Sequence, residues 1–227
     1  MDPVIIGGIA VAVVVGIIVF IKLRGGGGDP EELYQTGLSL YKRGRVEDAI
    51  KEYKRAAKVN PSEPKYHHGM GMALASKGNQ KKAIDSFKEA VRVAPDNVDS
   101  HFQLGMNYTK LGKLDDAISA YKETVRIAPG EAKYRLSLGI ALHDNGMITD
   151  AITNLKKSLE LAPNNPAVYD RLGVALYDKG QLNEALAAFD NFLRMSASTT
   201  SSRVQSVTMM KDAILNKIKA DKDKKKE

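Results

Sequence analysis

Two patterns of apolar residues divide the chain of 227 residues. Residues 4–21 form one unbroken aliphatic run, VIIGGIAVAVVVGIIVFI, without a charged side chain. Beyond residue 29 the apolar residues instead recur at helical spacing within short segments, as in Val46, Ala49, Ile50 and Tyr53. The first pattern predicts a membrane-spanning helix, and the second predicts a series of amphipathic helices.

The aliphatic run is long enough to act as a signal-anchor, since about 27 Å of helix matches the hydrocarbon thickness of a bilayer. It lacks the basic start and small-residue cleavage site of a removable signal peptide. Lys22 and Arg24 follow it, whereas only Asp2 is charged before it. The positive-inside rule therefore predicts a single-pass protein of the cell (inner) membrane, with residues 1–24 as the anchor and the remainder facing the cytoplasm.

Three small residues, Gly8, Ala12 and Gly16, recur every fourth position of this predicted helix. Such a stripe lets two membrane helices approach closely and predicts a homo-oligomer contact, although small residues are also common in membrane helices that do not pair. Residues 25–29 begin with four glycines and predict a flexible linker of about 11 Å reach.

A period of 34 residues organises the next 170 positions into five repeats, at 30–63, 64–97, 98–131, 132–165 and 166–199. Four sets of positions keep this period: Gly37, Gly71, Gly105, Gly139 and Gly173; Gly44, Gly78, Gly112, Gly146 and Gly180; Ala49, Ala83, Ala117, Ala151 and Ala185; Pro61, Pro95, Pro129 and Pro163.

Each repeat predicts a helical hairpin. In the first, helix A covers residues 31–43 and ends at Gly44, a residue suited to a left-handed cap. Helix B covers residues 46–59, and Pro61 forces the next turn. A glycine inside a helix is unfavourable by about 1 kcal/mol relative to alanine. We therefore expect Gly37 to let Ala49 of helix B pack closely against helix A.

These positions resemble the tetratricopeptide-repeat family, whose pattern the third repeat follows with Leu104-Gly105, Tyr108, Ala117, Tyr121 and Pro129. The departures lie at Thr36, at Ala197 and at the large residue near the start of helix A, which is Leu33, His67, His101, Arg135 or Tyr169. The resemblance implies an all-α fold, a right-handed superhelix in which helix A lines a concave channel.

The C-terminal residues 200–227 predict a capping helix and a basic tail. From Arg203 to Ala220 the apolar residues Val204, Val207, Met210, Ile214 and Ile218 share one side. A solenoid end needs such a cover. Contact of the same helix with a membrane is the alternative.

Charge and residue types exclude several classes of function. Of the net charge of +7, residues 29–199 hold 24 basic and 22 acidic side chains, too even a balance for a nucleic-acid partner. Cysteine is absent, and the histidines lack metal-ligand spacing. No phosphate loop or catalytic constellation is present, so we expect no enzyme activity, no metal and no cofactor.

The resemblance implies a peptide-binding groove formed by three rows of helix-A residues. The middle row is entirely apolar and lacks the asparagine with which chaperone-binding members clamp a carboxylate. It predicts a ligand with apolar anchors, an amphipathic helix or an extended hydrophobic peptide. Alternatively, the row packs against neighbouring helices or is covered by the C-terminal helix. The rows are Tyr34, His68, Phe102, Leu136 and Asp170; Leu38, Met72, Met106, Ile140 and Val174; Tyr41, Ala75, Thr109, His143 and Tyr177.

Two functions remain open from the sequence. The first is a membrane-anchored scaffold that recruits or assembles protein partners through the groove. The second is a structural protein that self-assembles into a membrane-associated lattice or filament, as similarity to the magnetosome-associated repeat proteins implies.

Overall fold

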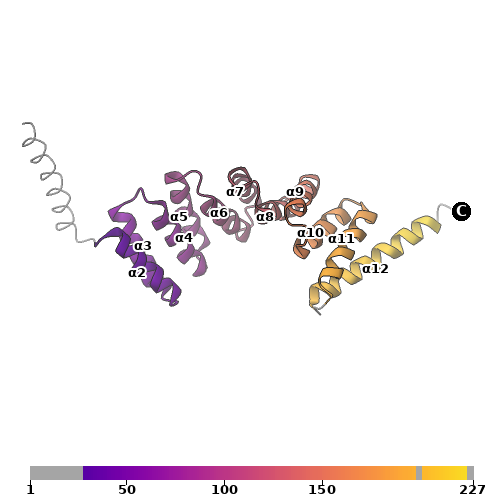
Figure 1. The fold of residues 1–227 in the computed structure, drawn as a ribbon, viewed down its shortest axis with the longest axis horizontal. Helices are drawn as coiled ribbons and strands as arrows, with labels where there is room; N and C mark the ends of the chain where they lie inside the picture. The colour runs from indigo at the N-terminus through magenta and orange to yellow at the C-terminus, as the bar shows by residue number, and fades with distance from the viewer. Residues whose placement is uncertain (1–27, 198–200, 224–227) are drawn as a thin grey trace, which may run out of the picture. The chain divides into compact units, whose positions relative to one another are not determined.

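The computed structural model describes residues 28–197 and 201–223, and within these ranges the chain is entirely α-helical (Figure 1). The predicted membrane helix, with Gly8, Ala12 and Gly16, lies outside the described residues. Among the described helices, none combines the length and the apolar composition needed to cross a membrane. The described helices are α2 (Pro30–Lys42), α3 (Val46–Val59), α4 (Pro64–Ser76), α5 (Gln80–Val93), α6 (Val98–Lys110), α7 (Leu114–Ile127), α8 (Ala132–Asp144), α9 (Ile148–Leu161), α10 (Pro166–Asp178), α11 (Leu182–Met195) and α12 (Ser202–Asp223).

The helices fall into two compact units, one ending at Gln103 and the other beginning at Leu104, so the division lies within α6. In the first unit α2 packs on α3 and α4 on α5; in the second, α8 packs on α9 and α10 on α11. Each pair is one predicted repeat, and helix B of the first repeat begins and ends at the predicted residues. The all-α repeat fold is therefore confirmed.

A left-handed glycine ends helix A in every repeat. In the first, Gly44 has φ of 76°, its N–H donates to Tyr41 O at 3.0 Å, and Arg45 N–H donates to Leu40 O at 2.9 Å. These two bonds satisfy carbonyls that the helix end would leave unpaired. The same conformation recurs, as predicted, with φ between 70° and 81° at Gly78, Gly112, Gly146 and Gly180.

The glycine inside helix A packs differently from our expectation. A Cβ added to Gly37 would lie 2.8 Å from Cε1 of Tyr53, and one added to Gly105 would lie 2.5 Å from Cε1 of Tyr121. The large residue one turn beyond the alanine therefore covers the glycine. Ala49 instead lies in a buried cluster with Tyr53 and Ala73 of the next hairpin. Glycine is needed because an added Cβ would overlap the large helix-B side chain, an aromatic ring in four repeats and Leu155 in the fourth.

Consecutive repeats within a unit are tied by the residue near the start of helix A. His67 Nε2 donates to Pro61 O at 2.9 Å, and His101 Nε2 donates to Pro95 O at 2.8 Å. In the second unit Arg135 Nε lies 3.4 Å from Pro129 O. These side chains bind the closing proline of the preceding repeat, which explains why polar residues replace the usual large apolar one.

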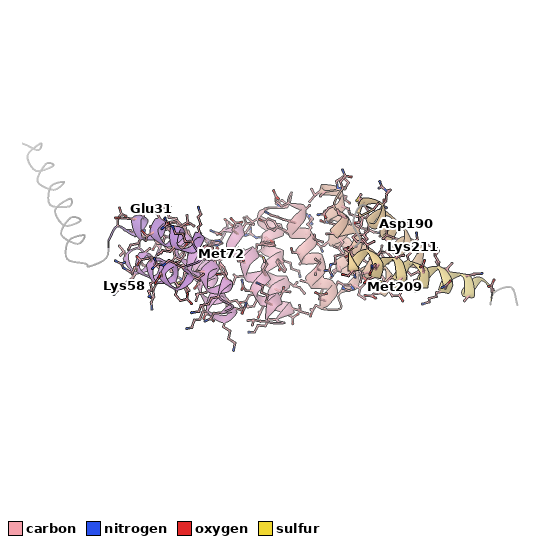
Figure 2. The ribbon with its side chains drawn as sticks, turned by 90° about the horizontal axis from the view of Figure 1, so that it is seen from below. Glu31, Lys58, Met72, Asp190, Met209 and Lys211 are labelled. Atoms are coloured by element: carbon pink, nitrogen blue, oxygen red, sulfur yellow. The ribbon has the colours of Figure 1, made fainter. Side chains whose placement is uncertain are left out.

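Helix α12 packs on α10 and α11 at the C-terminal end of the second unit. Val207 and Ile214 are fully buried in a cluster with residues of α10 and α11, and Val204, Met210 and Ile218 pack against the same cluster. On its flank, Lys211 Nζ lies 2.5 Å from an Asp190 carboxylate oxygen of α11 (Figure 2). The amphipathic face of α12 therefore completes the core of the last hairpin.

Candidate functional site

The predicted groove residues of the first unit lie on α2, α4 and the start of α6. Those of α2 and α4 are half-buried, whereas Tyr53 and Phe87 on the adjoining helices B are fully buried. Met72, marked in Figure 2, is such a residue on α4. The rows are thus partly open to solvent on helices whose other face forms the core. The half-buried row residues of this unit are Tyr34, Leu38, Tyr41, His68, Met72, Ala75 and Phe102.

Tyr34 is held by two further tyrosines. Its ring centroid lies 5.6 Å from that of Tyr53 and 5.5 Å from that of Tyr66, and Lys65 Nζ lies 5.5 Å from the Tyr34 centroid. Burial raises the pKa of Tyr53 to about 12. These contacts limit the rotamers of Tyr34, which remains half-buried.

His68 is an uncharged member of the same row. Its Nδ1 lies 2.8 Å from Ser100 Oγ, and its ring meets the ring of Phe87 edge-on at a centroid distance of 5.4 Å. Burial lowers the pKa of His68, while the nearby Asp99 carboxylate acts in the opposite direction. The imidazole is therefore mainly neutral at neutral pH, which suits an apolar surface.

In the second unit the rows are also half-buried over α8. Ile140, His143 and Val174, three predicted groove residues, line a pocket of about 10 Å³ together with Asp144, Leu155 and Arg171. This volume holds no more than a water molecule. The pocket is therefore too small for a peptide side chain, and three of its six lining residues are ionisable. The half-buried row residues of this unit are Met106, Thr109, Leu136, Ile140, His143 and Val174.

Two acids that the sequence analysis missed stand beside His143. Its Nε2 lies 2.7 Å from Asp178 Oδ2, and its Nδ1 lies 3.6 Å from Asp144 Oδ1. The signal was present, because the 34-residue period places residue 178 one position beyond the counterpart of residue 143 in the next repeat. The row thus has a polar border at the C-terminal ends of α8 and α10.

The fifth repeat presents its predicted groove residues differently. Asp170 is buried and forms an ion pair with Arg203 of α12. Val174 and Leu136 pack against the cluster that contains Val207 and Ile214. Tyr177 remains exposed. Helix α12 therefore occupies part of this end of the predicted surface, and Asp170 already has its partner within the chain.

Of the two remaining row positions, Ala75 is half-buried on α4. Thr109 donates its hydroxyl to Gly105 O at 2.9 Å, a bond within its own helix. In the described ranges, no three histidine or acidic side chains gather as a metal site would require.

Models of the tetratricopeptide repeat match residues 34–98 and 98–131, and a TPR-repeat model matches residues 141–180. Among solved structures, MamA from Desulfovibrio magneticus RS-1, residue 41 to its end, is 23% identical with a TM-score of 0.70, covering 78% of this chain and all of that one. YrrB, a TPR protein with an unusual peptide-binding site, is 22% identical with a TM-score of 0.70. The match covers 79% of this chain and 92% of that one.

Identities this low show a shared fold alone, and no curated protein matches the sequence. The family models, however, cover helices α3 to α7, α9 and α10 and all five left-handed glycines. The chain belongs to the tetratricopeptide-repeat family.

Proposed function

We propose that this protein is a membrane-anchored interaction scaffold that captures an apolar peptide or an amphipathic helix on the helix-A face of its repeats. One observation carries the proposal. Leu38 and Met72 in the first unit, and Met106 and Ile140 in the second, are half-buried apolar side chains on helices that also carry buried core residues. Apolar groups in this position gain free energy when a ligand removes their remaining surface from water.

The chemistry of the row favours a ligand with varied apolar anchors. Methionine is unbranched and adapts to different partners, and Met72 and Met106 occupy the same position of successive repeats. Tyr34 and the neutral His68 add ring faces with a polar edge. The fold shared with YrrB, described as having a peptide-binding site, supports a peptide as the ligand.

Anchoring rests on the sequence of residues 4–21 and on Lys22 and Arg24 after them. The anchor would hold the repeats at the cytoplasmic face of the cell membrane. A reporter fused after Glu227 should then be cytoplasmic in intact cells. A reporter signal from the opposite side of the membrane contradicts this orientation.

Changing Met72 and Met106 together to Gln tests the binding surface. Partner capture from native membranes should fall, while the melting temperature stays unchanged because both side chains are only half-buried. Met147→Gln with Met209→Gln is the matched control, since these methionines are exposed and lie outside the rows. Undiminished capture by the Met72/Met106 variant, or loss of its stability, refutes the assignment.

Self-assembly into a lattice or filament is the second candidate, and the similarity in fold to MamA favours it. End-to-end stacking meets an obstacle, because α12 buries Val207 and Ile214 at the C-terminal end. Light scattering of residues 29–227 separates the candidates: a scaffold remains monomeric, whereas a lattice protein forms larger species. If the full chain alone dimerises, replacement of Gly8 and Gly16 by Leu tests the small-residue stripe.

A further inference from the structure

The outer face of α3 is a continuous basic surface. Lys51, Lys54, Arg55 and Lys58 follow the spacing i, i+3, i+4, i+7, which brings them to one side of the helix. All four are exposed, and together with Glu52 they line an open hollow of about 420 Å³. Like charges at this spacing repel one another along a helix. An anionic partner relieves that repulsion.

The 34-residue register provides an internal comparison for this face. Every later repeat carries at least one acid at the four corresponding positions, whereas the first repeat carries only cations. The fold itself therefore does not require a basic helix-B surface. These acids are Asp85 and Glu89 in the second repeat, Glu123 in the third, Glu160 in the fourth and Asp190 in the fifth.

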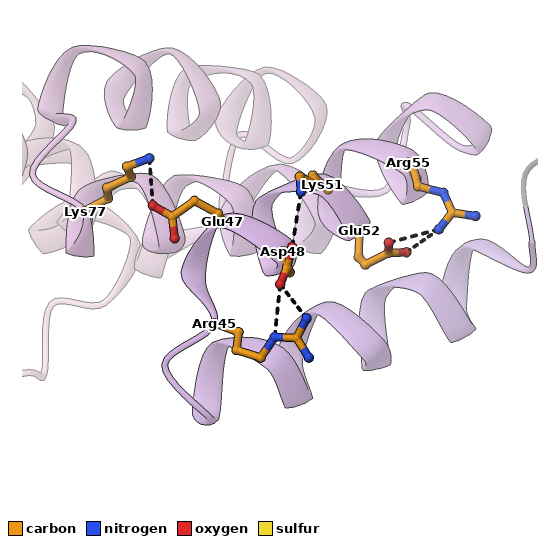
Figure 3. Close-up of polar contacts among 7 residues, drawn as sticks. All are labelled: Arg45, Glu47, Asp48, Lys51, Glu52, Arg55 and Lys77. Carbon is orange, nitrogen blue, oxygen red and sulfur yellow. Dashed lines mark hydrogen bonds and ion pairs between the residues drawn. The ribbon is translucent and has the colours of Figure 1, made fainter.

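Two of the cations are partly neutralised. Arg55 NH1 lies 2.9 Å and 2.7 Å from the two carboxylate oxygens of Glu52, and Lys51 Nζ lies 3.2 Å from Asp48 Oδ1 (Figure 3). Lys54 and Lys58 form no ion pair with any part of the chain that the structure describes. These two ammonium groups are the ones available to a partner.

The basic face lies at the end of the hairpin from which the N-terminal segment departs. Because α2 and α3 are antiparallel, Leu33 near the start of α2 shares a cluster with Ala56 and Ala57 near the end of α3. Glu31 and Lys58 accordingly lie at the same end in Figure 2. Four acids lie at this end. Asp29 caps α2, Glu31 pairs with Lys65 at 2.8 Å, Glu32 is exposed, and Glu63 is the N-cap residue of α4.

We infer that Lys54 and Lys58 bind anionic lipid headgroups of the membrane that carries the anchor, an inference that rests on the proposed anchoring. Gly25 to Gly28 span at most about 14 Å when fully extended. This reach keeps the end of α3 near the headgroups, within one or two Debye lengths, each about 8 Å in physiological salt. Val59, 46% exposed beside Lys58, adds an apolar contact. The first repeat thereby docks on the bilayer and orients the helix-A rows.

The full chain, which lacks cysteine, allows a direct test. Ser62→Cys places a fluorescent label in the exposed turn after α3, and quenchers on the lipid headgroups report its distance from the bilayer. Vesicles of phosphatidylcholine are compared with vesicles in which about a third of the lipid is phosphatidylserine. We expect stronger quenching in the anionic vesicles. Lys54→Gln with Lys58→Gln should lower the ratio of docked to undocked protein by about fivefold for each lysine.

The matched control is Lys122→Gln with Lys157→Gln, two exposed helix-B lysines of the third and fourth repeats. It removes the same charge far along the chain from the anchor and should leave quenching unchanged. Equal quenching in both kinds of vesicle overturns the inference. This result is expected if the basic face binds an acidic protein instead of lipid. An equal loss in the control variant overturns it too, since it would indicate attraction by net charge alone.

The anchor is tested separately by flotation of the full chain with phosphatidylcholine vesicles in high salt, where the basic face contributes little. Absence of flotation refutes the anchor but not the basic face. In that case low-salt binding to the anionic vesicles decides: loss in the Lys54/Lys58 variant supports the lipid contact, and unchanged binding refutes it.

Discussion

Arg203 of α12 forms a bidentate ion pair with Asp170 of α10, with Nε 2.9 Å from Oδ2 and NH2 2.5 Å from Oδ1. The Asp170 side chain is 9% exposed and that of Arg203 is 42% exposed. The pair therefore joins a buried carboxylate to a guanidinium at the surface. It fixes the first turn of α12 on the last helix A and closes the row of groove residues there.

Arg203→Ala leaves the Asp170 carboxylate buried without its partner. The free energy of unfolding, measured by urea denaturation, should fall by about 1–3 kcal/mol. Lys211→Ala is the control on the same helix, since its ion pair with Asp190 is more exposed and should contribute less than about 1 kcal/mol. If the two substitutions lower the free energy of unfolding equally, burial of the Asp170 carboxylate does not make the loss of its partner more costly.

Gly105→Val forces a branched side chain into the ring of Tyr121. Overpacking of this kind should lower the free energy of unfolding by about 1–3 kcal/mol. Gly130→Ala, at a position with no atom within 4 Å of the added Cβ, should change it by less than about 0.5 kcal/mol. If Gly105→Val melts like the unmodified protein, the close contact between Gly105 and the ring of Tyr121 does not exist.

Alkaline pH should weaken the first unit through Tyr53. Its pKa in the folded protein is about 12, against 10.0 for an unburied tyrosine. Above pH 10 the unfolded chain therefore loses this proton while the folded chain retains it, and stability declines until the pH passes about 12. Urea midpoints measured on either side of pH 10 should show the decline. Tyr53→Phe should reduce it, whereas Tyr177→Phe, which removes an exposed phenol, should not.

Acidic pH should weaken the same unit through His68, whose pKa lies below the 6.5 of an exposed histidine. As pH falls below 6.5, the unfolded chain binds a proton that the buried imidazole does not, so stability decreases. Chemical shifts of the His68 ring, followed by NMR during an acid titration, report the folded pKa directly. A midpoint at or above 6.5 contradicts the burial of this side chain, and His101→Gln should leave the titration unchanged.

Local features of the chain were predictable because each depends on only a few neighbouring residues. The position of Gly44 determined where helix A ends, since glycine adopts a positive φ at little cost. The spacing of Val207 and Ile214 determined which face of α12 is buried, because residues seven apart lie on the same side of a helix. The 34-residue period then repeated each such result along the chain.

The choice between neighbouring candidates for one contact depended on the tertiary structure. Ala49 and Tyr53 lie one turn apart on the same side of helix B, so periodicity alone could not tell which of them meets Gly37. The way the two helices pack brings the ring of Tyr53 against Gly37. Likewise, the sequence predicted α12 as a cover, but only the packed hairpin placed Arg203 beside Asp170. Spacing defines faces, whereas contacts follow from how those faces fit together.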